Sequence, residues 1–116
     1  RNPTPEARQV RQARVLENGR KLAAGEGNGQ TLPLNAAWDE GLLRSFLASD
    51  FDRFKTMTDE EIAEMGGRGG QEIRAWIASF ACLRAIAPYE AQVRYYSAID
   101  EWLDGMALAT ARPVAV

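Results

Sequence analysis

The sequence of 116 residues contains no histidine and a single cysteine, Cys82. Histidine is the commonest metal ligand in proteins and the usual general base near neutral pH. Its absence excludes Ser-His-Asp catalysis, Cys-His catalysis and histidine-based metal sites within this chain. Cys82 has no partner for a disulfide, which is typical of a reducing, cytoplasmic compartment. Because its neighbours are apolar, we expect Cys82 to pack inside the protein.

Long hydrophobic runs and an excess of one charge are also missing. No apolar run approaches the ~20 residues that a membrane span needs, and we expect no membrane partner. The formal net charge of -2 gives no reason to expect a nucleic-acid partner. The hydrophobic share of 46% is typical of one globular domain or part of one. Since the first residue is Arg1 and no targeting segment follows, we expect a processed or truncated chain.

The first 24 residues carry six basic and two acidic side chains. They predict an arginine-rich helix over residues 6–24 that ends at Gly25. The helix could bind nucleic acid or an acidic partner, or it could be a solvated helix packed on the rest of the protein. We favour the second interpretation, because no aromatic residue accompanies the arginines. Residues 25–34 form a Gly-rich loop without the Lys-Ser/Thr pair of a phosphate-binding loop.

The middle of the chain predicts several helices. Asn35 is placed as the N-cap of a helix that runs to about residue 48 with Leu47 on its apolar face, and a short segment follows at 50–55. Thr58 and Glu61 have the spacing of a capping box. Four glycines in residues 66–70 then precede the most apolar helix, over residues 71–86, which we expect to be buried against several elements.

Two short segments near the end of the chain, residues 93–96 and 106–110, have strand propensity, although the second could also be the end of a helix. Two strands alone are marginally stable in water. The fold class that we predict is therefore an α/β or α+β parent. In that parent, this piece is mostly α-helical, and its one or two C-terminal strands belong to a larger sheet.

Glu72 is the position that most resembles a chemical site. It follows a glycine-rich turn, which lets backbone come close to a bound molecule, and it begins an apolar helix. A carboxylate in this position is also common as a simple partner of the helix dipole, and from spacing alone that second interpretation is favoured.

A series of motifs, in order along the chain, resembles the C-terminal part of the class III extradiol ring-cleavage dioxygenases. Within that class, the resemblance is strongest to enzymes that act on 2,3-dihydroxyphenylpropionate. The motifs are residues 34–39, 58–61, 66–76, 94–96 and 101–105. The glycine turn followed by Glu72, three residues and Trp76 matches the family's glutamate motif.

The resemblance implies an Fe(II) enzyme that cleaves a catechol with O₂. Its iron is held by two histidines from the N-terminal part and by one glutamate, here Glu72. It also implies that Tyr95 and Tyr96 lie near the non-reacting end of the substrate, although both could equally be packing residues. No catalytic residue is expected in this chain itself.

The same resemblance predicts how the chain is organised. Residues 1–116 would be the C-terminal portion of a single catalytic domain, with the N-terminal helix (1–24), the glycine loop (25–34) and the helices and strands of 35–116. Such a piece would be inactive without the N-terminal part of the same chain, and we expect a homo-oligomer, since open strand edges associate. The alternative is a small helical accessory or interaction subunit that docks on a catalytic partner.

Overall fold

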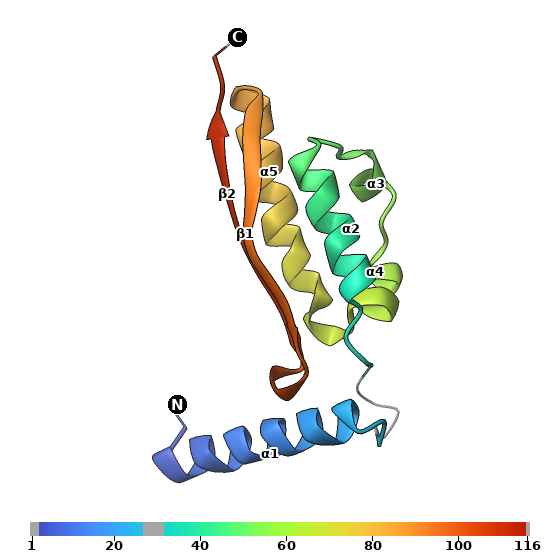
Figure 1. Cartoon of the computed structure of the whole chain (residues 1–116), viewed down its shortest axis with the longest axis vertical. Helices are drawn as coiled ribbons and strands as arrows, with labels where there is room; N and C mark the ends of the chain where they lie inside the picture. The colour runs from blue at the N-terminus through green and yellow to red at the C-terminus, as the bar shows by residue number, and fades with distance from the viewer. Residues whose placement is uncertain (1–2, 27–31, 116) are drawn as a thin grey trace.

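The computed structural model describes residues 3–26 and 32–115. Figure 1 shows a group of helices beside a long β-hairpin, with the first helix set apart at one end. The prediction of a mostly helical piece with C-terminal strands is confirmed. In chain order the elements are α1 (Pro5–Ala23), α2 (Ala36–Leu47), α3 (Asp52–Lys55), α4 (Asp59–Gly66), the 3-10 turn η1 (Arg68–Glu72), α5 (Ile73–Ile86), β1 (Tyr89–Ile99), the 3-10 turn η2 (Asp100–Trp102) and β2 (Asp104–Pro113).

The predicted helix caps are confirmed. The Asn35 side chain accepts a hydrogen bond from the Trp38 backbone N–H at 3.2 Å, which satisfies one free donor of α2. At α4, the Thr58 hydroxyl accepts from the backbone N–H of Glu61, and the Glu61 carboxylate accepts from the backbone N–H of Thr58. These local contacts explain why the start of each helix could be located from sequence.

Phe46 of α2 is the centre of the hydrophobic core and is 1% exposed. Its ring lies 4.7 Å from the ring of Phe80 and 5.0 Å from that of Phe54, measured between centroids. The buried Tyr89 hydroxyl donates a hydrogen bond to the Phe46 carbonyl oxygen and so ties β1 to α2. Aromatic residues from α2, α3, α5 and β1 thus close one small core, which holds the hairpin against the helices.

The strands β1 and β2 form an antiparallel hairpin that is longer than the sequence predicted. Tyr96 pairs with Ala107 and Ser97 with Met106, and the register shifts by one residue between Val93 and Tyr95. The hairpin is two-stranded within the described residues. The second strand pairs along its whole length, which excludes the alternative of a helix end. The larger sheet of the parent fold stays a prediction.

Helix α5 differs from its prediction in two ways. It begins at Ile73, because the glycine-rich residues close a 3-10 turn before the α-helical pattern starts. The expected burial is wrong: α5 contains no fully buried residue, Ile86 is 81% exposed and Cys82 is exposed. The aromatic residues of α5 face the Phe46 core, and its other side faces solvent. Leu47, at the end of α2, is likewise 40% exposed.

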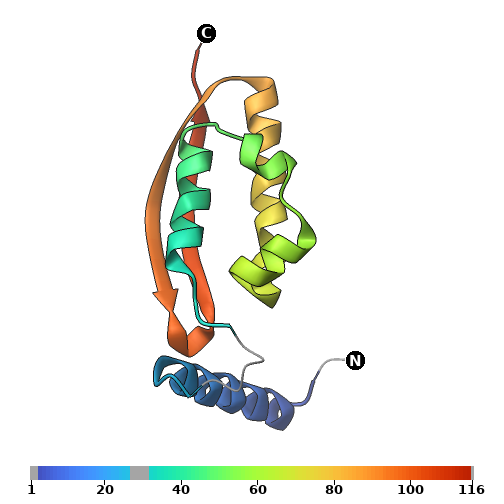
Figure 2. The same cartoon turned by 90° about the vertical axis from the view of Figure 1, so that its right-hand side faces the viewer.

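Helix α1 lies across the end of the hairpin, as Figure 2 shows from the side. Its contact with the body is made at η2, where Gly19 is buried. This arrangement agrees with the favoured interpretation of a solvated helix packed on the rest of the protein. Half of the predicted glycine loop of residues 25–34, namely residues 27–31, lies outside the described residues. Within the part of the chain that the structure describes, no helix is long and apolar enough to cross a membrane.

Candidate functional site

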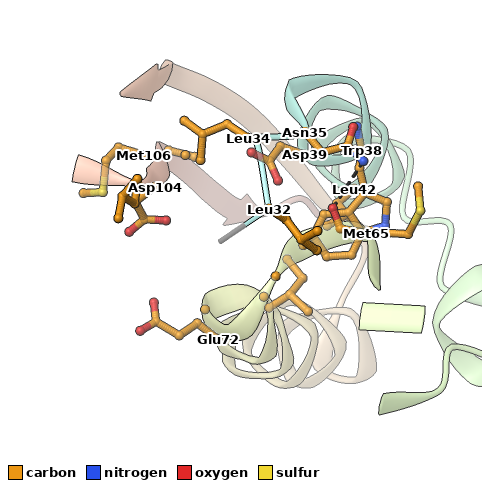
Figure 3. A pocket seen from close by; sticks show the side chains of 18 of the residues that line it. Leu32, Leu34, Asn35, Trp38, Asp39, Leu42, Met65, Glu72, Asp104 and Met106 are labelled. Atoms are coloured by element: carbon orange, nitrogen blue, oxygen red, sulfur yellow. Dashed lines mark hydrogen bonds between the residues drawn. The ribbon is translucent and has the colours of Figure 1, made fainter. Parts of the chain in front are cut away.

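A cavity of about 680 Å³ opens where α1, α2, the glycine turn, the start of α5 and the end of the hairpin come together. Its size suits a small organic ligand, since pockets for such ligands are typically ~300–1,000 Å³. One part of the wall is apolar and contains Leu34, Trp38, Leu42 and Met106. Figure 3 shows these side chains together with three carboxylic acids, Asp39, Asp104 and Glu72.

Glu72, the residue predicted as a metal ligand, lines this cavity. It is the last residue of η1 and immediately precedes α5, so its side chain leaves the backbone where the chain turns into the helix. Figure 3 places Glu72 on the opposite side of the pocket from Asp39 and Asp104. An exposed carboxylate at the wall of a pocket is available to a ligand, and the structure adds this observation to the sequence motif.

The glycine turn is shaped by its contact with Trp38. A Cβ atom at Gly66 would lie 2.5 Å from Cζ3 of the Trp38 ring, so a side chain at this position would collide with the indole. Gly67 has a φ of 68°, a conformation that favours glycine. The Asn35 side-chain amide donates a hydrogen bond to the Met65 carbonyl oxygen at 3.2 Å and joins the start of α2 to the end of α4. Together these contacts set where Glu72 stands relative to α2.

Asp39 and Asp104 were not predicted from the sequence. Asp39 follows Trp38 on α2, and Asp104 is the first residue of β2. Burial raises the pKa of the Asp104 carboxyl above its ordinary value of 3.8, and the negative charges of Glu72 and Asp39 raise the pKa further. A pocket that holds three carboxylic acids is attractive to a cation or to a ligand with acidic hydroxyl groups.

The two tyrosines predicted to contact substrate are separated by the structure. Tyr96 lines the pocket, and its hydroxyl donates a hydrogen bond to Oδ2 of Asp39 at 2.7 Å. Tyr95 is 51% exposed and is not among the described residues that line the pocket. Adjacent strand residues point to opposite faces, which is why both tyrosines do not reach the same site.

Helix α1 also contributes to the wall through Asn18, which sequence reasoning missed. The sequence did contain a signal for this contact. Asn18 and Gly19 are neighbours in the interior of α1, and both residue types form helices poorly. Such a pair indicates that the helix approaches another part of the chain. Asp39 and Asp104 carried no comparable signal, because single acids at the surface of helices and strands are common.

The pocket residues offer one carboxylate to a metal ion rather than a complete set of ligands. Among residues 3–26 and 32–115, no group of three His, Cys, Asp or Glu side chains could hold a metal ion. Glu72 offers a hard oxygen donor next to an open cavity, which suits Fe(II). Any histidine ligand would have to come from outside this chain, since it has none.

The chain is similar over almost its whole length to a group of enzymes that share one name. It is 54% identical over 114 residues to the 2,3-dihydroxyphenylpropionate/2,3-dihydroxicinnamic acid 1,2-dioxygenase of Photorhabdus laumondii, covering 98% of this chain and 35% of that protein. The enzyme of the same name from Cupriavidus pinatubonensis is 39% identical over 116 residues, covering 100% of this chain and 36% of the relative. The enzyme of the same name from Rhodococcus rhodochrous is 40% identical over 115 residues, covering 97% of this chain and 35% of the relative.

The chain therefore spans about a third of the length of the curated relatives that it matches. No protein-family model matches it.

Proposed function

We propose that this chain is the C-terminal portion of an extradiol dioxygenase, since by homology it belongs to the family of the 2,3-dihydroxyphenylpropionate/2,3-dihydroxicinnamic acid 1,2-dioxygenases. The intact protein would use Fe(II) and O₂ to cleave the ring of a catechol such as 2,3-dihydroxyphenylpropionate in the cytoplasm. This portion would be inactive by itself and would act as part of a homo-oligomer. The observation that carries the proposal is Glu72 at the wall of a pocket with one apolar side, in the motif that the family resemblance singled out.

Glu72 would hold the iron together with two histidines from the N-terminal part of the intact protein. A site with two histidines and one carboxylate leaves coordination positions open, and the bound Fe(II) would supply activation of the catechol and of O₂. Because the chain has no histidine, its own contribution to the ligand set is this carboxylate. The glycine turn at 66–70 gives a ligand access to it.

The other residues of the pocket would bind and enclose the substrate. Trp38, Leu42 and Met106 line the cavity with apolar surface that suits an aromatic ring and excludes water. Asp104 has a raised pKa and lines the same cavity, so it binds a proton more tightly than an ordinary aspartate does. These residues would orient the ring while the hydroxyl groups of the catechol face the metal.

The relatives carry the matching region within a longer chain, which supports a portion of one catalytic chain over a separate accessory subunit. The contact of α1 with the hairpin and the presence of Asn18 in the pocket point the same way. Helix α1 is then part of the catalytic unit rather than an arm for an external partner.

The test is to express the complete reading frame, load it with Fe(II), add 2,3-dihydroxyphenylpropionate under air and follow the yellow ring-cleavage product. Glu72→Gln should lower bound iron and reduce turnover by more than about 100-fold, since even residues outside the ligand set cost 10–100-fold. Glu64→Gln removes a carboxylate from the exposed side of α4 and should behave as the unmodified protein. Full activity of Glu72→Gln, or no iron-dependent product from the intact protein, would contradict the proposal.

A further inference from the structure

One hydrogen bond ties β1 to α2 at the wall of the pocket. The Tyr96 hydroxyl, from β1, donates to Oδ2 of Asp39, from α2, at 2.7 Å across 57 positions of sequence. Burial and the hydrogen bond to Asp39 raise the pKa of Tyr96 well above its ordinary value, so the hydroxyl keeps its proton throughout the physiological range. The donor is therefore always available for this contact.

The second strand of the hairpin is fitted to the same point. A Cβ atom at Gly105 would overlap the Asp39 carboxylate and would lie 3.3 Å from the Tyr96 hydroxyl oxygen. Only a residue without a side chain leaves room for the Tyr96–Asp39 pair. The absence of a side chain at position 105 thus has a structural reason, which is the close packing of β2 against a polar contact between α2 and β1.

The Tyr96–Asp39 contact lies in one wall of the pocket. Asp39, Tyr96 and Gly105 all line the cavity, as does Asp104, the residue before Gly105. Glu72 lies on the other side, at the start of α5 (Figure 3). The hairpin is joined to α2 at this end by the Tyr96–Asp39 hydrogen bond, while Tyr89 makes the corresponding contact with Phe46 at the far end. A shift of the hairpin end would change the width of the cavity in front of Glu72.

We propose that Tyr96 is a positioning residue: its hydrogen bond to Asp39 holds the hairpin wall at a fixed distance from Glu72 and thereby sets how tightly the catechol ring is bound. This inference rests on the proposed function, but it assigns Tyr96 no contact with the reacting atoms. Loss of the bond widens the pocket and weakens binding in the ground state and the transition state alike, so KM rises while kcat is preserved.

The test uses the intact, iron-loaded protein. Tyr96→Phe removes only the hydroxyl and should raise KM by about 3- to 10-fold, the equivalent of one net hydrogen bond, with kcat within about twofold. Ser79→Ala is the matched control, because it also removes one hydroxyl hydrogen bond, to the Ala75 carbonyl on the exposed side of α5. It should leave KM unchanged.

Variants of Asp39 separate positioning from a general loss of structure. Asp39→Asn keeps an oxygen that can accept from Tyr96 and should therefore raise KM less than Asp39→Ala does. Asp39→Ala should match Tyr96→Phe, and the double variant should be no worse than either single one. A lower kcat at constant KM in Tyr96→Phe, or additive effects in the double variant, would overturn the inference.

The contribution of the Tyr96–Asp39 hydrogen bond to stability is measured without enzyme turnover, by applying the same double-mutant cycle to urea unfolding. The single variants should lower the unfolding midpoint and the double variant should add no further shift. A missing ring-cleavage activity in the unmodified protein would thus refute the proposed function, whereas independent effects of the two variants on unfolding would refute the Tyr96–Asp39 coupling.

Discussion

Asp104 shows how the surroundings of a single residue change its chemistry. It stands at the start of β2 with Glu72 and Asp39 as negative neighbours, and burial together with these charges raises its pKa above 3.8. A carboxyl group with a raised pKa binds its proton more tightly in the folded state than in the unfolded state. Its ionised form therefore destabilises the fold at neutral pH, and this cost disappears as the pH falls through the raised pKa.

We accordingly expect Asp104→Asn to stabilise the iron-free protein at pH 7, by about 0.5 kcal/mol or less, because solvent screens a partly exposed group. The gain should vanish as the pH approaches 3.8, where the aspartic acid is itself neutral. Urea midpoints measured at several pH values would show this convergence. Glu26→Gln, an exposed acid just after α1, serves as control. A gain of Asp104→Asn that did not depend on pH would contradict the electrostatic explanation.

At the scale of elements, the contact between α1 and the hairpin depends on a glycine. A Cβ atom at Gly19 would lie 2.5 Å from the Asp100 carbonyl oxygen and 2.7 Å from Cα of Glu101, both backbone atoms of η2. Glycine inside a helix costs roughly 0.5–1 kcal/mol relative to alanine. Glycine is present in α1 despite that cost because the backbone of η2 leaves no room for a side chain at position 19.

Gly19→Ala should therefore destabilise the protein by about 1–3 kcal/mol, as expected for overpacking, although alanine is the better helix former. Gly41→Ala in α2 is the matched control, since its Cβ would meet only the ends of two flexible side chains, Arg53 with Nη1 at 3.2 Å and Arg44 with Nη2 at 3.8 Å. We expect that control to be neutral or stabilising. Urea unfolding of both variants provides the measurement, and a Gly19→Ala protein as stable as Gly41→Ala would contradict the packing of α1 on η2.

The elements also show where sequence reasoning succeeded. The helix starts at Asn35 and Thr58 were predictable because a cap is a contact between residues three positions apart. The burial of α5 was predicted wrongly. An apolar stripe indicates that one face of a helix can be covered, but it does not indicate which part of the protein covers that face. The pocket residues show the same difference between local and distant contacts. Glu72 was predicted from a local motif, whereas Asp39 and Asp104 line the same pocket because segments distant in sequence pack together.

At the scale of the whole molecule, the chain is more extended than a self-contained domain. Its radius of gyration is 16.9 Å, whereas a compact domain of this length has about 13 Å. Its accessible surface is 8451 Å², against about 6,300 Å² for a compact monomer of this mass. The outer face of the hairpin exposes Tyr95 and Leu108, and Ile86 of α5 is 81% exposed. This surface agrees with the proposal that the rest of a larger protein covers it.

The 116-residue chain expressed alone should therefore self-associate, because both strands of the hairpin have open edges and one apolar face. Sedimentation velocity over a range of concentrations should show species larger than the monomer. Leu108→Lys places a charge on the exposed hairpin face and should shift the distribution toward monomer. Val10→Lys on α1, where the native side chain is similarly exposed at 61%, should not. The reverse result would assign the association to α1 instead.

The sequence by itself determined the absence of histidine, the order of helices and strands, the caps and the glutamate motif at Glu72. These features depend on composition or on contacts within a few residues. Only the tertiary structure brought Asn18, Asp39, Tyr96 and Asp104 to the same pocket, separated Tyr95 from it and left one side of α5 uncovered. The reason is physical: these arrangements depend on which distant segments pack together, and on how much of the surrounding protein is present to cover them.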